Sequence, residues 1–285
     1  MSFARVLVVG ATGLLGPYLL DAARDLAGPA GVVLGAARTG ADLDLDACDP
    51  QAVARLLDGL RPDLVIHAAG LTDVDACEAD PARAMAVNAD AAGHLARALD
   101  PAARLVYVST DQVYPDLPGP HREDAAAPVN AYGRSKLAGE AQALAHPRAL
   151  VLRTNLFGPS RTPGRKSLSD FVVESLAAGR AVTLFTDIFF SPLHMADLGR
   201  FLALAARRGL GGVYNLGCRE GASKRDFALA VAARKGLSTA TATAGSGASL
   251  PGRARRPRDM RLDVSRLEAA LGVTLPTLSQ EVEKL

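Results

Sequence analysis

The stretch Arg5-Val-Leu-Val-Val9, followed by Gly10-Ala-Thr-Gly13-Leu-Leu-Gly16, decides how this chain folds. An apolar run such as Val6–Val9 is typical of a strand that is buried on both faces of a parallel sheet. Glycines at these spacings permit a tight turn, a close approach of the backbone to a pyrophosphate, and close packing of a helix on a strand. A helix over residues 14–27 then offers free N–H groups and a partial positive charge to phosphate oxygens. The stretch therefore predicts a dinucleotide-binding turn.

Apolar runs and helical patterns alternate through the first 155 residues. Strands are predicted near residues 5–9, 32–37, 63–68, 104–109 and 149–154, and helices at residues 14–27, 50–60, 80–99 and 130–146. Three of the helix starts are marked by Asp49-Pro50, Asp80-Pro81 and Asn130. The alternation predicts an α/β fold with a doubly wound parallel sheet.

The pattern changes after residue 157. Further helices are predicted at residues 167–179 and 194–208, and further strands at residues 181–185 and 212–216. We expect a dinucleotide-binding domain over residues 1–157, with its sheet extended by residues 181–218, and a smaller C-terminal substrate-binding cap from residues 158–180 and 219–285. Residues 238–249, rich in Ser, Thr, Ala and Gly, predict a loop or a weak strand that leads to Pro251.

A second group of residues carries the chemistry. Ser109-Thr110-Asp111 follows an apolar run, and Tyr132 and Lys136 come four residues apart in the next predicted helix, where they share one face. An ammonium beside a phenol stabilises the phenolate, so a group with a pKa of about 10 can exchange protons near neutral pH. A hydroxyl from Ser109 or Thr110 could hold a carbonyl oxygen beside that phenol. Together these groups suit hydride transfer to or from a sugar or alcohol carbon, although the helix spacing alone also fits an exposed aromatic–cation pair.

The glycine motif, Ser109-Thr110-Asp111 and Tyr132-x-x-x-Lys136 together resemble the extended short-chain dehydrogenase/reductase family. Within it, the chain is most similar to the dTDP-4-dehydrorhamnose reductases, which reduce a nucleotide-linked 4-keto sugar. Further matching segments are spread along the chain: Pro62–Ala69, Asp73–Glu78, Val87–Ala89, Tyr132–Glu140 and Arg255–Pro257. The resemblance implies a Rossmann-type fold and NADPH-dependent reduction of dTDP-4-dehydrorhamnose to dTDP-rhamnose, or of a related dTDP-linked 4-keto deoxysugar.

The resemblance also implies roles for individual residues. Tyr132 would donate the proton, Lys136 would bind the nicotinamide ribose as well as lower the Tyr132 pKa, and Thr110 would orient the ketone. The residues expected to contact the cofactor are Gly10, Thr12, Gly13, Leu14, Leu15, Gly16, Arg38, Thr39, Asp46, Ala47, Ala68, Ala69, Gly70, Tyr132 and Lys136. The residues expected to contact the substrate are Thr110, Asp111, Gln112, Asn155 and Arg256. Asp46 could equally be a loop or capping residue, and for Ser109 we favour a structural role at the strand end.

Some positions depart from the pattern of these reductases. Gln112 stands where the related 4,6-dehydratases carry a Glu base, and an amide cannot act as that base, which favours simple reduction. Arg153-Thr154-Asn155-Leu156 replaces Arg-Thr-Ser-Trp in a chain without Trp, so an aromatic wall of the sugar or nucleotide pocket is missing. The segment Asp187–Leu193 also differs from the corresponding segment of these reductases. Two alternatives stay open: a nucleotide-sugar epimerase or dehydratase, and a non-catalytic subunit, because the β subunit of methionine adenosyltransferase shares the Tyr-Gly-x-x-Lys-Leu pattern.

The end of the second strand predicts the choice of cofactor. A carboxylate there would favour NAD, but the strand ends at Arg38-Thr39. Arg38 can pair with a 2′-phosphate and Thr39 can donate a hydrogen bond, which predicts NADPH. Asp42 and Asp44 lie nearby and leave the use of NADH open, and the plain alternative for Arg38 is a solvated side chain.

Cations are needed to hold a nucleotide diphosphate. The strongest candidate is Arg255-Arg256-Pro257, because guanidinium groups bind phosphate through paired hydrogen bonds. Arg161, Arg165 and Lys166 come second, with a solvated basic loop as the alternative.

Three further polar residues are predicted to be structural. Arg153, at a strand end, is expected to form an ion pair. His67 lies in an apolar strand and is expected to be a core residue with satisfied hydrogen bonds. His194 is expected to begin a helix. No metal site is expected.

Composition sets further bounds. A net charge of +2 does not point to nucleic acid or a membrane surface as a partner. Cys48, Cys77 and Cys218 are scattered, which favours a reduced, cytoplasmic protein. The first residues run into the first strand without a leader, and no apolar run approaches the roughly 18 residues that span a bilayer. The alanine-rich helix at residues 80–99 could pair with a second subunit, which leaves a homodimer open, or could simply cover the sheet.

Overall fold

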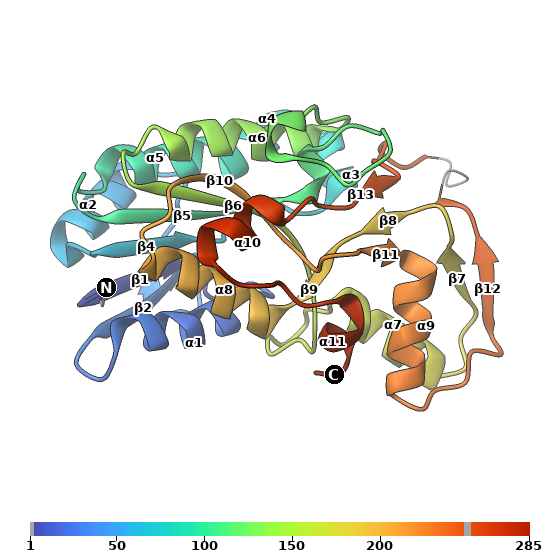
Figure 1. The fold of residues 1–285 in the computed structure, drawn as a ribbon. Helices are drawn as coiled ribbons and strands as arrows, with labels where there is room; N and C mark the ends of the chain where they lie inside the picture. Colours follow the sequence, from blue (N-terminus) through green and yellow to red (C-terminus); the bar gives the residue numbers. More distant parts are fainter. Residues whose placement is uncertain (1–2, 248–251) are drawn as a thin grey trace.

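A parallel sheet with helices on both faces makes up the larger part of the molecule, and a smaller lobe lies beside it (Figure 1). The computed structural model describes residues 3–247 and 252–285. The strands of the sheet are β1 (Arg5–Val9), β2 (Val32–Ala37), β3 (Leu43–Asp44), β4 (Leu64–His67), β5 (Arg104–Thr110), β6 (Ala149–Phe157), β9 (Pro192–His194) and β10 (Gly212–Leu216). Their order is β10-β6-β5-β4-β1-β2-β3, with β9 beside β6. The predicted doubly wound α/β fold is confirmed.

The sheet is covered by two layers of helices. Those of the first 150 residues are α1 (Gly16–Ala27), α2 (Pro50–Leu60), α3 (Val74–Ala79), α4 (Pro81–Met85), α5 (Ala91–Ala98) and α6 (Ala131–Leu144). Later come α8 (Met195–Arg207) and α10 (Ser265–Leu271). One core cluster joins the sheet to α1, α8 and α10, and another joins it to α2, α5 and α6. Because both faces are covered, the strands read as apolar runs rather than as alternating patterns.

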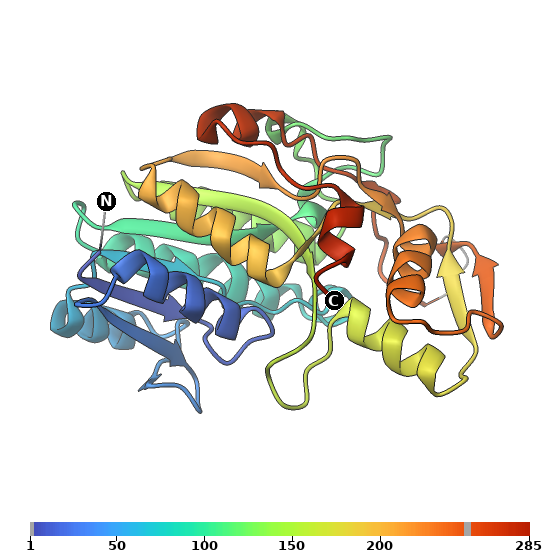
Figure 2. The same ribbon diagram turned by 60° about the horizontal axis from the view of Figure 1, so that its bottom comes forward.

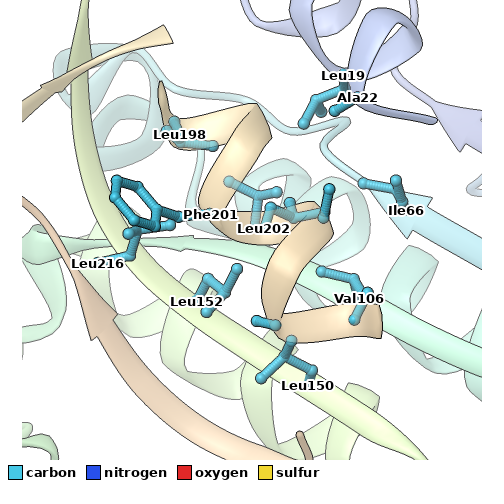
Figure 3. Packing of buried hydrophobic residues seen from close by; sticks show 14 of the residues in the cluster. Leu19, Ala22, Ile66, Val106, Leu150, Leu152, Leu198, Phe201, Leu202 and Leu216 are labelled. Atoms are coloured by element: carbon cyan, nitrogen blue, oxygen red, sulfur yellow. The ribbon is translucent and has the colours of Figure 1, made fainter. Parts of the chain in front are cut away.

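The helix α8 shows how this core is packed. Leu198, Phe201 and Leu202 point from α8 toward the sheet residues Leu150 and Leu152 (Figure 3). Leu202 is fully buried. Truncation of such a side chain to alanine costs about 2–5 kcal/mol.

The smaller lobe has a core of its own. Its elements are α7 (Leu168–Ala177), β7 (Val182–Phe185), β8 (Phe189–Phe190), β11 (Ala222–Ser223), α9 (Lys224–Arg234), β12 (Ala242–Gly245), β13 (Asp259–Met260) and α11 (Leu278–Val282). They surround a cluster that includes Phe157, Phe190 and Phe227. Figure 2 shows the lobe to one side of the sheet. Its strands form two small sheets, β11-β8-β13 and β12-β7.

Several predicted elements differ from the structure. The strand predicted at residues 181–185 forms β7, but it pairs with β12 and does not extend the main sheet. The single helix predicted over residues 80–99 is divided into α4, a wide π-helical turn at Ala86–Asp90, and α5. The helix α3 was not predicted. The weak strand predicted within residues 238–249 forms as β12, whereas residues 248 and 249 lie outside the described residues.

Membrane-spanning helices and clusters of metal-binding side chains are both absent from residues 3–247 and 252–285. None of their helices is long and apolar enough to cross a bilayer. Nor do they hold a group of three or more His, Cys, Asp or Glu side chains that could bind a metal ion.

Candidate active site

The glycine turn lies at the point where the order of the sheet reverses. The strands that follow β1 in the chain lie on both of its sides, β2 on one and β4 on the other, and such a point is where α/β sheets bind ligands. Gly10 has a φ of 94°, and a Cβ on it would lie 2.6 Å from the backbone nitrogen of Ala69. The two predicted cofactor segments, Gly10–Gly16 and Ala68–Gly70, therefore meet as expected.

The start of α1 suits a phosphate group. Its N-cap, Leu15, makes no side-chain capping hydrogen bond, so among the described residues no cap side chain serves the first N–H groups of the helix. A Cβ on Gly16 would lie 2.1 Å from the carbonyl oxygen of Ala11, so only glycine permits this close turn. The turn and the helix start form a cradle that fits a dinucleotide pyrophosphate.

The adenosine end of the crevice follows β2. Arg38 and Thr39 are both exposed there. Asp42 accepts a hydrogen bond from the backbone nitrogen of Gly35 at 2.8 Å, so this carboxylate is engaged with the strand β2. Asp46 accepts from the backbone nitrogen of Cys48 at 3.0 Å, which is a turn within its loop, and the N-cap of α2 is Asp49.

The basic loop after β6 contacts the glycine turn. The Thr162 hydroxyl donates to the carbonyl oxygen of Gly13 at 3.0 Å, and the guanidinium of Arg161 pairs with Asp21 at 2.6 Å. Lys166 pairs with Glu174. Arg161 and Lys166 were second candidates for binding the substrate diphosphate, and the structure pairs both cations with carboxylates.

The helix α6 brings the catalytic candidates together. Its N-cap, Asn130, accepts from the backbone nitrogen of Gly133 at 2.8 Å. Tyr132 and Lys136 are both buried, as expected for side chains on one helical face that packs against β5. The Thr110 hydroxyl, at the end of β5, lies close enough to the Tyr132 phenol to affect its pKa. The predicted meeting of these two side chains is therefore present.

Lys136 takes a different position from the one expected. Its Nζ donates to the carbonyl oxygen of Val108 at 2.8 Å and lies 4.0 Å from the centre of the Tyr107 ring. Burial lowers the pKa of Lys136 to about 7, and the charge of Glu140 opposes this shift.

The pKa of Tyr132 is consequently not lowered by Lys136. Burial raises it above the ordinary phenol value, the hydrogen bond with Thr110 opposes the rise, and the charge of Asp111 adds to it. The expectation that Lys136 depresses this pKa is wrong for the arrangement seen, because the ammonium is turned toward a sheet carbonyl.

Asn88 is a site residue that sequence reasoning missed. Its Nδ2 donates to the Ser135 hydroxyl at 2.9 Å and to the carbonyl oxygen of Leu71 at 3.0 Å, and its Oδ1 accepts from the Leu71 nitrogen at 2.8 Å. It thereby ties the segment after β4 to the residue preceding Lys136. The matching segment Val87–Ala89 was its only sequence signal.

Asp111 lies at the centre of the substrate side. It is 1% exposed, and its Oδ2 accepts a hydrogen bond from Asn155 Nδ2 at 2.6 Å. Burial raises the pKa of Asp111 to about 6, against the hydrogen bond from Asn155 and the charge of Lys224. Gln112 donates to the Met260 sulfur at 3.0 Å and so contacts the smaller lobe.

A buried ion pair supports the site from behind. Arg153 binds Glu140 through Nε and Nη2, with a shortest distance of 2.8 Å. Ser109 donates to the same carboxylate, and the Tyr114 hydroxyl lies 3.0 Å from Arg153 Nη1. The ion pair predicted for Arg153 is confirmed. Ser109 is structural, as favoured, but its partner is a buried carboxylate rather than the backbone.

The arginine-rich segment borders the site. Ala254 packs against a cluster that contains Tyr132, and Asn130 donates to the carbonyl oxygen of Arg255 at 2.9 Å. Arg256 Nη2 pairs with Asp75 at 2.9 Å. Arg256 is thus near Tyr132, and a carboxylate holds its guanidinium.

The two histidines differ in outcome. His194 is the N-cap of α8, as predicted, and its Nδ1 accepts from the backbone nitrogen of Ala196 at 3.2 Å. For His67 the prediction of satisfied hydrogen bonds is wrong, since neither ring nitrogen has a partner among the described residues. The ring lies against Tyr107, and burial lowers its pKa to about 3, so it is neutral.

Known proteins of similar sequence include two reductases. A dTDP-4-dehydrorhamnose reductase from Mycobacterium tuberculosis is 36% identical over 78% of this chain and 72% of its own length. A probable low-salt glycan biosynthesis reductase from Haloferax volcanii is 33% identical over 98% of this chain and 96% of its own length. A methionine adenosyltransferase 2 subunit beta from Pongo abelii is 31% identical over 94% of this chain and 83% of its own length.

A solved structure agrees with this relationship. The dTDP-4-dehydrorhamnose reductase from Bacillus anthracis, in complex with NADP, has a TM-score of 0.87 and 25% identity, covering 100% of this chain and 97% of its own. The predicted reductase class and type of cofactor match these relatives. The model of the RmlD substrate binding domain matches residues 4–285, and the chain belongs to this family.

Proposed function

We propose that this protein reduces the 4-keto group of a nucleotide-linked deoxysugar with NADPH, and that the substrate is dTDP-4-dehydrorhamnose or a related dTDP-4-keto sugar. The observation that carries the proposal is the approach of the Thr110 hydroxyl to the buried Tyr132 phenol, beside a glycine cradle that fits a dinucleotide. The reductases among the relatives support the same reaction class.

The residues of the site divide the reaction between them. NADPH, when bound, would supply the hydride for the carbonyl carbon. Thr110 orients the carbonyl oxygen, and Tyr132 donates its proton to that oxygen, so the ketone becomes an alcohol. Lys136 binds the nicotinamide ribose hydroxyls. The raised pKa of Tyr132 keeps the phenol protonated, as a proton donor requires.

The cofactor contacts the two segments that meet at the crevice. The glycine turn, with Thr12, Leu14 and Leu15, holds the pyrophosphate, and Ala68–Gly70 run beneath the cofactor. Arg38 and Thr39 bind the 2′-phosphate, and the hydrogen bond of Asp42 to the strand β2 supports NADPH over NADH. Asp46-Ala47 borders the adenine.

The substrate lies between the sheet and the smaller lobe. Asp111, Gln112 and Asn155 contact the sugar, and Arg256 contacts the diphosphate with the guanidinium donors that Asp75 leaves unused. We propose that the dinucleotide-binding domain and the substrate-binding cap predicted from the sequence form the two halves of this site.

Consumption of NADPH tests the proposal. The purified protein is mixed with NADPH and each member of a panel of thymidine- and uridine-linked 4-keto sugars, and NADPH absorbance and the reduced sugar are followed. We expect stoichiometric oxidation with a thymidine-linked member. Tyr214→Phe, on the strand β10, is a matched control that should leave the rate unchanged. No oxidation with any member would contradict the proposal.

A second candidate function follows from one relative. The similarity to a methionine adenosyltransferase subunit beta favours a regulatory chain that binds NADPH without turnover. Cofactor binding without oxidation, together with co-purification of a larger enzyme, would favour it. An epimerase or dehydratase would transform a sugar nucleotide with no net use of NADPH.

Location and assembly are also proposed. Cys48, Cys77 and Cys218 are free thiols, which supports a reducing, cytoplasmic setting. We also propose that the protein forms a homodimer. Measurement of its molar mass in solution tests this proposal.

A further inference from the structure

A lysine of the smaller lobe faces the catalytic edge of the sheet. Lys224 begins α9, and its backbone nitrogen donates to the carbonyl oxygen of Ile188 at 2.8 Å, which fixes the helix start to the strand β8. Its Nζ lies 3.5 Å from the centre of the Phe190 ring. The ammonium is therefore held over an aromatic face of the small sheet, at the end of a half-buried side chain.

The small sheet brings this ammonium to Asp111. Phe190 of β8 pairs in register with Met260 of β13, and the Met260 sulfur accepts the hydrogen bond from Gln112. Gln112 directly follows Asp111. The charges of Asp111 and Lys224 are close enough for each to shift the pKa of the other toward its charged form.

Both groups keep unused hydrogen-bonding capacity. Within the part of the chain that the structure describes, the Lys224 ammonium makes no hydrogen bond or ion pair. Asp111 Oδ1 has only a long contact of 3.3 Å, to the Thr110 hydroxyl. The Lys224 side chain is half-buried, and the three donors of its ammonium are free to bind an acceptor on a ligand. A hydroxyl group can accept from Lys224 and donate to Asp111 at the same time.

We propose that Asp111 and Lys224 together bind the substrate hydroxyl on the carbon next to the ketone, and so select 4-keto sugars that carry this hydroxyl. The inference rests on the proposed function, in which Thr110 orients the ketone oxygen. Asp111 follows Thr110 in the chain, and its Oδ1 lies 3.3 Å from the Thr110 hydroxyl, so the pair is beside the group that orients the ketone. A site built around a hydroxyl rejects a deoxy analogue by up to about 10⁴-fold, because its polar groups are left unpaired.

Two substrates and two variants test the pair. We measure kcat/KM, at saturating NADPH, for a dTDP-4-keto-6-deoxy sugar with a 3-hydroxyl and for its 3-deoxy analogue. The unaltered protein should favour the hydroxyl-bearing sugar by at least about 100-fold. Lys224→Met should lower kcat/KM for that sugar about 30- to 300-fold and change it less than about threefold for the deoxy sugar. Lys235→Met, at the exposed end of the same helix, is the control.

The outcomes separate this inference from the proposed function. Affinity for NADPH should be the same in all forms, because Lys224 faces the sugar. Lys224→Arg, which keeps the charge, should recover part of the selectivity and guards against a variant that fails to fold. An equal loss for both sugars, or an unchanged ratio, would overturn the inference while the reductase activity stands. Absence of turnover of either sugar by the unaltered protein would overturn both.

Discussion

The Nζ of Lys136 donates to the carbonyl oxygen of Val108 at 2.8 Å, so this buried lysine rests against the sheet. Burial lowers the pKa of Lys136 from 10.5 to about 7. Between these values the unfolded chain binds more protons than the folded one, so stability rises with pH, and the cost of burying the charge is fully present below pH 7.

Lys136→Met is therefore expected to stabilise the protein at low pH. At pH 6 the free energy of unfolding in urea should increase by about 2–4 kcal/mol, and the gain should shrink toward pH 10, where the native lysine is neutral. The variant should lose turnover, so the substitution that raises stability removes activity. A variant that is less stable than the unaltered protein at pH 6 would contradict the burial argument.

Tyr132→Phe removes the proton donor and leaves the ring in place. Hydride transfer in a single turnover should slow by about 10²–10⁴-fold, while the affinity for NADPH stays close to that of the unaltered protein. Stopped-flow measurement of NADPH absorbance with preformed enzyme–NADPH complex checks this. Near-normal hydride transfer would exclude Tyr132 from the chemical step.

Arg38→Ala tests the choice of cofactor. Loss of the charge-assisted contact with the 2′-phosphate should reduce the ratio of kcat/KM for NADPH to that for NADH by about 10-fold or more. Arg55→Ala, an exposed arginine on α2, serves as the control for net charge. An unchanged ratio would show that Arg38 is only a solvated side chain.

Glu140→Gln tests the buried ion pair. The side chains of Arg153 and Glu140 are only 4% and 3% exposed, so removal of one charge leaves the other unpaired at a cost of about 3–5 kcal/mol. The exposed pair of Lys166 and Glu174 offers a matched comparison, since Glu174→Gln should cost less than about 1 kcal/mol. Urea unfolding of both variants measures the difference, and equal costs would mean that burial has no influence.

The pair of Asp111 and Lys224 predicts a bell-shaped pH profile. Asp111, which faces Asn155, Thr110 and Lys224, has a pKa of about 6, and Lys224 has one of about 8 because burial outweighs the charge of Asp111. At saturating NADPH, kcat/KM for the hydroxyl-bearing sugar should rise through pH 6 and fall through pH 8, where one partner loses its charge. Asp111→Asn should abolish the acid limb. Persistence of that limb would assign it to another group.

Much of this fold could be predicted because its strands are covered on both faces. The runs at Val6–Val9 and Leu105–Val108 need no alternation to be recognised, and the helix caps at Asp49 and Asn130 follow from local chemistry. The shared face of Tyr132 and Lys136 follows from helix periodicity alone.

What could not be predicted depends on contacts between distant segments. The direction of the Lys136 side chain is decided by an acceptor on another strand, Val108. The π-helical turn around Asn88 interrupts a pattern that reads as one continuous helix. Lys224 gives no local signal, because its importance comes from a carboxylate more than a hundred positions earlier.

The register between β5 and β6 pairs Thr110 with Thr154, so Asp111, just beyond the end of β5, lies beside Asn155 of β6. Substitutions can reshape this pocket one side chain at a time without moving the backbone. Loss of a single residue within either strand would shift Asp111 relative to Asn155 by about 3.3 Å. The side chains of the shortened strand would also turn to the opposite face of the sheet. Descendants of this chain can therefore vary the chemistry here by exchange of residues, whereas insertions and deletions are confined to the connections outside the two strands.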